Sequence, residues 1–249
     1  MKRHHHFVTR RTAILTGISS VGAILLNGCV KPSPPTYGHI LRMGDALTYT
    51  AQRALLPGQS LVKEYKRSDR SSFPATGTTN PGDPAMGEFY SKDYAQYHKN
   101  SFADWRLKVE GRVARPGSYS LDDLYRFPSR TQITRHTCEE GWTAIGEWTG
   151  VPLSTILQHA GILPSARFIN FYAFDTAMES IDLMDAFHPQ TILAYGMNGN
   201  NLPIQHGAPL RLRVETQIGY KSVKYLQRIV VTDNFVDPGD TGWSWYTGI

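Results

Sequence analysis

The sequence contains few thiols: Cys29 and Cys138 are the only cysteines among its 249 residues. It has no Cys-x-x-Cys-His motif, which excludes the usual covalent attachment of a haem, and no pattern typical of a second redox centre. Cys29 ends an N-terminal segment with the features of an export signal. Cys138 is therefore expected to be the only thiol of the folded protein.

A long apolar run is also missing from the N-terminal segment. The uncharged run from Ala13 to Leu26 has fourteen residues, whereas a helix needs ~20 to cross a bilayer comfortably. This length suits the apolar part of a signal peptide, and Thr9 to Leu15, around Arg10-Arg11, resembles a twin-arginine signal. Residues 1–30 are therefore expected to direct export to the periplasm or another extracytoplasmic compartment.

The end of this segment resembles a lipobox. In Leu26-Asn27-Gly28-Cys29 the cysteine would be acylated and become the mature N-terminus. Simple cleavage nearby, without lipidation, is the alternative. Cys29 is thus a candidate membrane anchor.

The rest of the chain has little excess of either charge. Residues 1–28 hold four cations and no acid, so the formal net charge of +5 falls to +1 once they are set aside. A near-neutral protein has no broad basic surface for phosphates. This balance argues against a nucleic-acid partner.

The chain is expected to have three parts, with residues 1–30 as the first. Residues 31–100 should form a spacer and an extended arm, because the stretch from Pro57 to Asn100 is poor in aliphatic residues and rich in Gly, Pro, Ser, Thr and charge. Residues 101–249 have the mixed apolar and polar pattern of one folded domain.

Within that domain, apolar patterns predict short strands mixed with short helices. Strands are expected from Trp105 to Val109 and at 168–174, 192–197, 210–214 and 229–232. A capping box at Ser120 and Asp123 predicts a helix that reaches Phe127, and Val151 to Gly161 predicts another. Since strands and helices do not alternate regularly, the expected fold class is α+β.

Charged residues crowd Cys138 in the run Arg135-His136-Thr137-Cys138-Glu139-Glu140. A buried, inert thiol is one interpretation, although these neighbours argue against it. A nucleophile with His136 or His206 as base is another. A metal ligand is the third, but one thiolate cannot hold zinc or an iron–sulfur cluster, which need about four protein ligands. A metal here would have to arrive in a cofactor that supplies its own sulfur atoms.

Four sequence blocks support this third interpretation. They are Cys138-x-x-x-Trp142, Trp148-x-Gly150-Val151-Pro152-Leu153, His206 to Arg211, and Gly219 to Lys224. Together, over about Trp105 to Val236, they resemble the molybdopterin-binding domain of the sulfite oxidase superfamily. The spacing after the cysteine is more similar to the catalytic subunit of the periplasmic methionine sulfoxide reductases than to the sulfite oxidases, which typically place Asn and Arg where Glu139 and Glu140 stand.

The resemblance implies a sulfite-oxidase-type fold and a molybdenum-molybdopterin cofactor in its mononucleotide form. Cys138 would be the metal ligand, because a thiolate suits a soft coordination sphere. The implied activity is an oxidoreductase that transfers an oxygen atom, with a sulfoxide or another oxo compound as substrate and a separate haem protein as electron-transfer partner. A non-enzymatic lipoprotein that uses the same fold for binding is the alternative.

The resemblance also implies which residues contact the cofactor, whose phosphate needs fixed cations and backbone donors. The candidates lie in the later blocks, before them or in the arm: Thr176, His206, Arg211, Lys221, Ser222, Val223, Lys224 and Asn80. Arg135 and His136, next to Cys138, are candidates for shaping access of the substrate.

Overall fold

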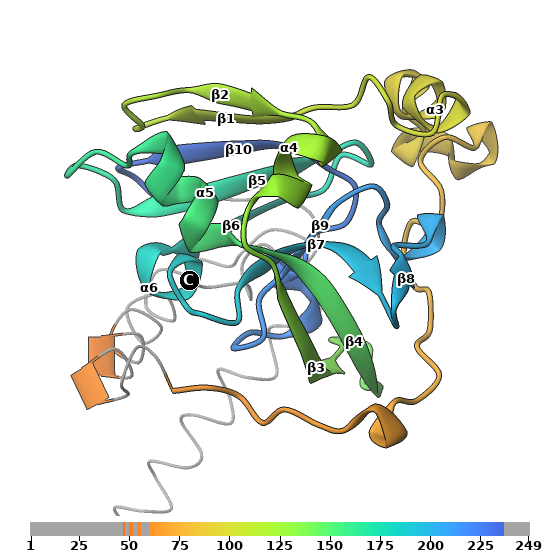
Figure 1. Cartoon of the computed structure of the whole chain (residues 1–249), viewed down its shortest axis with the longest axis horizontal. Coiled ribbons are helices and arrows are strands. Elements are labelled where there is room, and N and C mark those ends of the chain that lie inside the picture. The colour runs from red at the N-terminus through yellow and green to blue at the C-terminus, as the bar shows by residue number, and fades with distance from the viewer. Residues whose placement is uncertain (1–46, 48–49, 52–53, 56–59, 237–249) are drawn as a thin grey trace, which may run out of the picture. The chain divides into compact units, whose positions relative to one another are not determined.

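The computed structural model describes residues 60–236, together with residues 47, 50–51 and 54–55 (Figure 1). Contacts divide the chain into two units, and residues 60–236 all belong to the second, which spans Gln52–Thr241. The export-signal interpretation, including Cys29, lies outside the described residues. Among the described residues, no helix has the length and apolar character needed to cross a membrane.

The first sheet has five strands in the order β2-β1-β10-β5-β6. Its members are β1 (Leu107–Gly111), β2 (Gly117–Tyr119), β5 (Phe168–Ala173), β6 (Met178–Asp182) and β10 (Leu226–Thr232). β1 and β10 run parallel, and the other neighbours are antiparallel. Figure 1 shows this sheet above the second one.

The second sheet carries the residues around Cys138. It contains β3 (Arg130–Thr137), β4 (Thr143–Pro152), β7 (Ile192–Met197), β8 (Asn200–Asn201) and β9 (Arg211–Arg213). All pairs are antiparallel, with β4 between β3 and β7, and β9 paired to β7. The register pairs Arg211 of β9 with Ala194 of β7, and the side chain of Arg213, at the end of β9, reaches His136 near the end of β3.

Within residues 60–236 the helices are few and short. They are α3 (Lys92–Lys99), α4 (Leu121–Arg126), α5 (Leu153–Ala160) and α6 (Leu183–Ala186), with 3-10 turns η1 (Arg67–Asp69), η2 (Pro84–Phe89), η3 (Ile204–His206) and η4 (Gly219–Lys221). Mixed sheets with few short helices confirm the α+β fold class.

Both helices predicted from the sequence are present. Ser120 Oγ accepts a hydrogen bond from Asp123 N at 3.0 Å and the Asp123 carboxylate accepts one from Ser120 N at 2.9 Å, so the capping box of α4 is confirmed. α5 begins at Leu153, two residues later than expected, because Val151 and Pro152 pair with β7 as the end of β4. It ends before Gly161, whose φ of 70° favours glycine.

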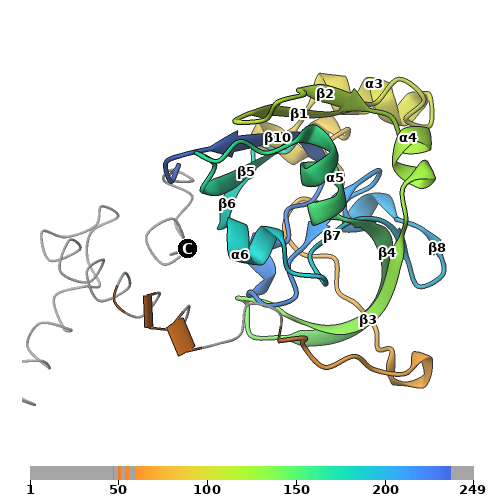
Figure 2. The same cartoon turned by 60° about the vertical axis from the view of Figure 1, so that its left-hand side comes forward.

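Residues 60–100 differ in part from the extended arm that their composition predicts. Figure 2 shows the orange segment following β3, and Tyr65 N donates to Ile133 O at 2.8 Å. The later part instead forms η2 and α3. α3 is held in the core by the fully buried Tyr94, whose hydroxyl donates to Ala208 O at 2.6 Å. The arm is therefore integrated with the domain.

The main core lies between the first sheet, α5 and the inner parts of β7 and β9. Because Ile156 on α5 is fully buried there, Ile156→Ala is expected to lower the free energy of unfolding by about 2–5 kcal/mol. Leu163→Ala is the matched control, since Leu163 is 39% exposed, and should change stability by less than about 0.5 kcal/mol. Urea unfolding followed by circular dichroism measures both, and equal effects would contradict this packing.

Candidate active site

Cys138 lies in the tight turn that joins β3 to β4. Its backbone N donates to Trp142 O at 2.9 Å, and Gly141 N donates to Cys138 O at 3.1 Å. The residue is 6% exposed, yet its thiol is not among aliphatic groups. Sγ lies 3.5 Å from Glu139 Oε2 and 3.9 Å from Glu140 Oε2. Trp142 Nε1 donates to Glu140 Oε2 at 2.9 Å and fixes that carboxylate.

These surroundings keep the free thiol protonated. Burial raises the pKa of Cys138 to about 11, and the negative charges of Glu139 and Glu140 add to the effect. A thiol that is neutral at pH 7 is a poor nucleophile, which argues against a cysteine hydrolase. A bound metal ion reverses the balance, since a coordinating thiol loses its proton.

His136 lies two residues before Cys138 on the buried side of β3. Its Nδ1 is 2.7 Å from Arg213 Nη1, and because a guanidinium only donates, Nδ1 is the acceptor. Burial, with the charges of Arg213 and Arg211, lowers the pKa of His136 to about 2. Arg213 also contacts Glu215 through two hydrogen bonds of 2.8 and 3.1 Å. Arg213 is therefore paired, and it holds a neutral His136 in place.

Arg211 differs from Arg213, because it is buried without an acidic partner among the described residues. Its Nη1 donates to His206 O and its Nη2 to Ser222 O, both at 2.9 Å, while Nε has no hydrogen-bond partner there. Burial, followed by the charge of Arg213, lowers the pKa of Arg211 to about 9. A buried cation with a free donor is costly unless an anion joins it.

Other predicted cofactor residues lie around Arg211, and together with it they are called the Arg211 cluster. Burial and the charges of Arg211 and Lys224 lower the pKa of His206 to about 4. Ser222 Oγ accepts from Val214 N at 3.3 Å, and Val223 O accepts from Leu212 N at 2.8 Å. Burial and the charge of Arg211 lower the pKa of Lys224 to about 8. The structure thus brings together five of the predicted cofactor residues: His206, Arg211, Ser222, Val223 and Lys224.

Four other candidates lie outside this cluster. Buried Lys221 pairs with Glu179 Oε2 at 3.1 Å and donates to Ser180 O at 2.9 Å. Arg135 is exposed on the opposite side of β3 from His136, with its guanidinium 5.4 Å from the centre of the Tyr65 ring. Thr176 is exposed in the β5–β6 turn with a φ of 69°. Asn80 Oδ1 accepts from Gly82 N at 3.0 Å. None of these contacts draws the residue into the Arg211 cluster.

Phe73 belongs to the cluster but was missed by sequence reasoning. Its ring centre lies 5.2 Å from that of His136, 5.7 Å from Trp142, 5.3 Å from Trp148 and 5.6 Å from His206. A lone aromatic residue in a stretch of Gly, Ser and Thr was the only signal available. Arg213 was also missed, because an arginine on a strand is more often solvated than buried.

The set of residues fits molybdopterin. Arg211 offers an unused buried donor, and Trp148 Nε1 is also buried without a partner among the described residues. A phosphate group would satisfy the guanidinium and offset the crowding of Arg211, Arg213 and Lys224. Cys138 offers the soft ligand that a dithiolene-bound metal needs. No described group of three or more His, Cys, Asp or Glu side chains forms a conventional metal site.

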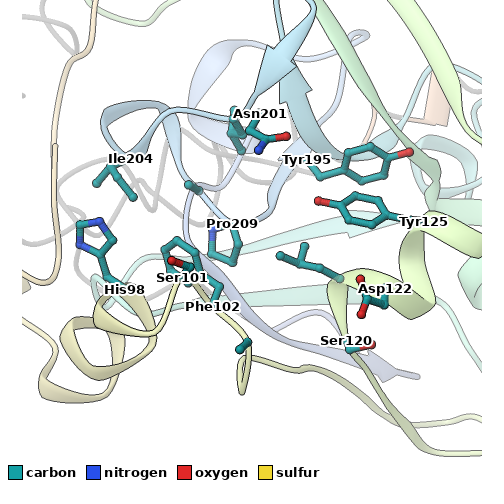
Figure 3. Close-up of a pocket in the computed structure, with 14 residues that line it drawn as sticks. His98, Ser101, Phe102, Ser120, Asp122, Tyr125, Tyr195, Asn201, Ile204 and Pro209 are labelled. Carbon is teal, nitrogen blue, oxygen red and sulfur yellow. The ribbon is translucent and has the colours of Figure 1, made fainter.

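A separate cavity of about 510 Å³ opens between α3, α4 and the segment that follows β8 (Figure 3). Tyr125, Tyr195 and Asp122 line one side, and His98 lies on the other. None of the candidate site residues lines it. Its wall includes Ile204 and Pro209, so it shares the loop that carries His206.

Gly219 approaches the site closely. A Cβ at this position would lie 2.6 Å from both Cε1 and Nε2 of His136, whose ring is fixed by Arg213. Gly219→Ala is therefore expected to displace the ring and to cost about 1–3 kcal/mol of stability, measured by urea unfolding. Gly117→Ala is the control, because its Cβ would have no contact shorter than 3.5 Å. Similar losses in both variants would contradict the close packing at Gly219.

The comparisons with known proteins agree with this geometry. The family described as oxidoreductase molybdopterin binding domain matches residues 94–238, and this chain belongs to it. The protein is a molybdenum-dependent oxidoreductase with a molybdopterin cofactor, and the non-enzymatic alternative is not favoured.

Several relatives are individually similar. The chain is 41% identical, over 96% of its length and 87% of the relative's, to YedZ1 of Azospira oryzae, which is named as a protein-methionine-sulfoxide reductase subunit. It is 36% and 32% identical to the protein-methionine-sulfoxide reductase catalytic subunits MsrP of Xanthomonas axonopodis and Pseudomonas syringae. These two matches cover 50% and 74% of this chain but only 44% and 58% of the relatives.

A solved structure supports the fold. The sulfane dehydrogenase SoxCD of Paracoccus pantotrophus is 28% identical with a TM-score of 0.52, covering 54% of this chain and 39% of that one. The sulfite-oxidase-type fold expected from the sequence is thereby confirmed, as is the resemblance to the methionine sulfoxide reductase catalytic subunits.

Proposed function

We propose that this chain is the catalytic subunit of an exported enzyme that reduces methionine sulfoxide. The observation that carries the proposal is the pair of carboxylates, Glu139 and Glu140, within 3.9 Å of the Cys138 thiol. Negative charges at this position repel an oxyanion such as sulfite and tolerate a neutral sulfoxide. The names of the relatives, including the 41% identical YedZ1, support the same substrate class.

The sulfur–oxygen bond of the sulfoxide breaks, two electrons and two protons are consumed, and the products are the thioether and water. The molybdenum cofactor, when bound, supplies two-electron oxygen-atom transfer. A separate haem protein delivers the electrons. Relatives named as catalytic subunits support an enzyme with more than one component.

The residues of the chain would bind and orient the cofactor. Cys138 would hold the metal, and Arg211 with Lys224 and Ser222 would bind the cofactor phosphate. His206 and Val223 complete this contact surface. His136 remains neutral because Arg213 occupies its Nδ1, so it adds no positive charge that would attract anions to the thiol. The sites assigned to Arg135, Thr176, Lys221 and Asn80 stay predictions.

A comparison of substrates tests the proposal. Holoprotein from a molybdopterin-competent host is assayed with reduced methyl viologen against free and peptide-bound methionine sulfoxide and dimethyl sulfoxide, and with ferricyanide against sulfite. Sulfoxide reduction should be faster than sulfite oxidation by at least about tenfold, and Glu139→Gln/Glu140→Gln should narrow that ratio. Faster oxidation of sulfite would overturn the assignment.

We also propose that the enzyme acts outside the cytoplasm. The twin-arginine-like segment around Arg10-Arg11 and the lipobox-like Cys29 support this location and a lipid anchor. Arg10→Lys/Arg11→Lys should retain the protein in the cytoplasm, as measured by cell fractionation. Cys29→Ser should release it from the membrane fraction, and incorporation of labelled palmitate should stop. Unchanged fractionation in either variant would contradict the corresponding signal.

A further inference from the structure

The segment from Glu64 to Thr78, here named the strap, contacts the second sheet. It lies outside the family match at 94–238. Glu64 forms a bridge with Thr134 of β3. Further along, Ser71 N donates to Ile145 O at 3.1 Å and Ser71 Oγ accepts from Ile145 N at 3.0 Å. The strap therefore follows β3 first and then crosses to β4.

An ion cluster fastens the first half of the strap. Glu147 on β4 has a side chain that is only 3% exposed, and its carboxylate accepts two hydrogen bonds of 3.0 Å from Arg67. Arg70 adds a contact of 3.3 Å. A buried carboxylate needs such partners, and both of its cationic partners among the described residues come from the strap. β4 thus carries a buried charge that the strap neutralises.

The second half of the strap is held by Lys224 of the Arg211 cluster and by its neighbour Tyr225. Lys224 Nζ donates to Thr76 O at 2.9 Å and also to Thr78 O. Tyr225 Oη donates to Thr78 O at 2.9 Å. Lys224 is a candidate for the cofactor phosphate, so strap and cofactor depend on the same side chain.

Phe73 lies between the two fastenings. Its ring contacts His136 and His206, with centres 5.2 and 5.6 Å apart, and the rings of Trp142 and Trp148. His206 in turn accepts from Arg211 through its carbonyl. The strap therefore places the ring of Phe73 between the Cys138 turn and the Arg211 cluster.

We propose that the strap retains the molybdopterin cofactor, with Phe73 as its contact and the Arg67–Glu147–Arg70 cluster as its fastening. The strap closes over the bound cofactor and slows its release. This role rests on the cofactor and is independent of which substrate is reduced. It assigns a cofactor-retaining function to a segment that precedes the family domain.

Release of the cofactor from purified holoprotein tests the proposal. Wild type, Phe73→Ala and Arg67→Ala/Arg70→Ala are incubated in a large volume of buffer, and bound molybdenum and pterin are measured over time by mass spectrometry and by fluorescence of the oxidised pterin. Both variants should lose cofactor roughly 10- to 100-fold faster. Arg112→Ala is the control, because Arg112 pairs with Asp233 away from the strap, and its release rate should match wild type within about twofold.

Amide hydrogen exchange gives a second measurement that does not depend on variants. In wild type, the amides of Glu64 to Thr78 should be better protected in holoprotein than in apoprotein, while those of β5 and β6 should change little. Equal release rates in folded Phe73→Ala and wild type, or equal protection of the strap in both forms, would overturn the strap's role. Absence of molybdenum from wild-type protein purified from a molybdopterin-competent host would instead overturn the cofactor assignment.

Discussion

Cys138→Ser is expected to yield a folded protein without molybdenum-dependent turnover. Serine is a hard ligand whose hydroxyl does not ionise easily, so it cannot replace a thiolate in a soft coordination sphere. Since loss of a residue that merely supports a metal ligand costs about 10- to 100-fold, loss of the ligand itself should cost at least that much. Metal analysis and the viologen assay measure the effect.

Cys29→Ser is the matched control for this variant, because it removes the other cysteine. Its turnover in detergent extracts should equal that of wild type. Iodoacetamide provides an independent measurement: the Cys138 thiol should resist labelling in holoprotein, where it is bound to metal, and react after the cofactor is removed under denaturing conditions. Wild-type turnover in Cys138→Ser would refute the metal-ligand role.

Arg211→Met is expected to have opposite effects on the two forms of the protein. Methionine has a similar length without charge, so in apoprotein the change removes a buried cation that has no acidic partner in the described part of the chain. The melting temperature should therefore be equal or higher. In holoprotein the phosphate loses a charged hydrogen-bond donor, which should weaken cofactor binding by about 2–5 kcal/mol. Differential scanning calorimetry of both forms, with molybdenum content, checks the two signs.

The paired neighbour Arg213 supplies the comparison. Because Arg213 already contacts Glu215 and His136, Arg213→Met should destabilise apoprotein as well as holoprotein. A clear loss of apoprotein stability in Arg211→Met, equal to that in Arg213→Met, would show that Arg211 has a structural role instead of a cofactor role.

The sequence predicts those elements whose residues carry a periodic pattern. In α5, Leu153, Ile156, Leu157 and Ala160 recur at helical spacing and all are fully buried, so its position was found within two residues. α3 was missed because its sequence is polar and only Tyr94 is buried. β4 was missed because its buried residues include Glu147 and glycines, which break the apolar alternation expected of a strand.

The residues of the candidate site were likewise predicted only where they stand in a recognisable sequence pattern. Arg211 and Lys224 stand in sequence blocks whose order and spacing resemble those of a known family, so their placement together followed from the sequence. The pairing of Lys221 with Glu179 joins residues 42 positions apart, and nothing near Lys221 indicates it. Phe73 reaches the site through contacts of the arm with β3 and β4, which are set by tertiary packing and not by local pattern.

The position of β10 has a consequence for how the protein is made. This strand is the last one along the described chain, yet it lies between β1 and β5 in the middle of the first sheet. Until Leu226–Thr232 leave the ribosome, β1 and β5 each present an open edge, and such edges promote aggregation. A nascent chain must therefore be kept from aggregating, by a chaperone or by rapid synthesis, until its final strand is inserted.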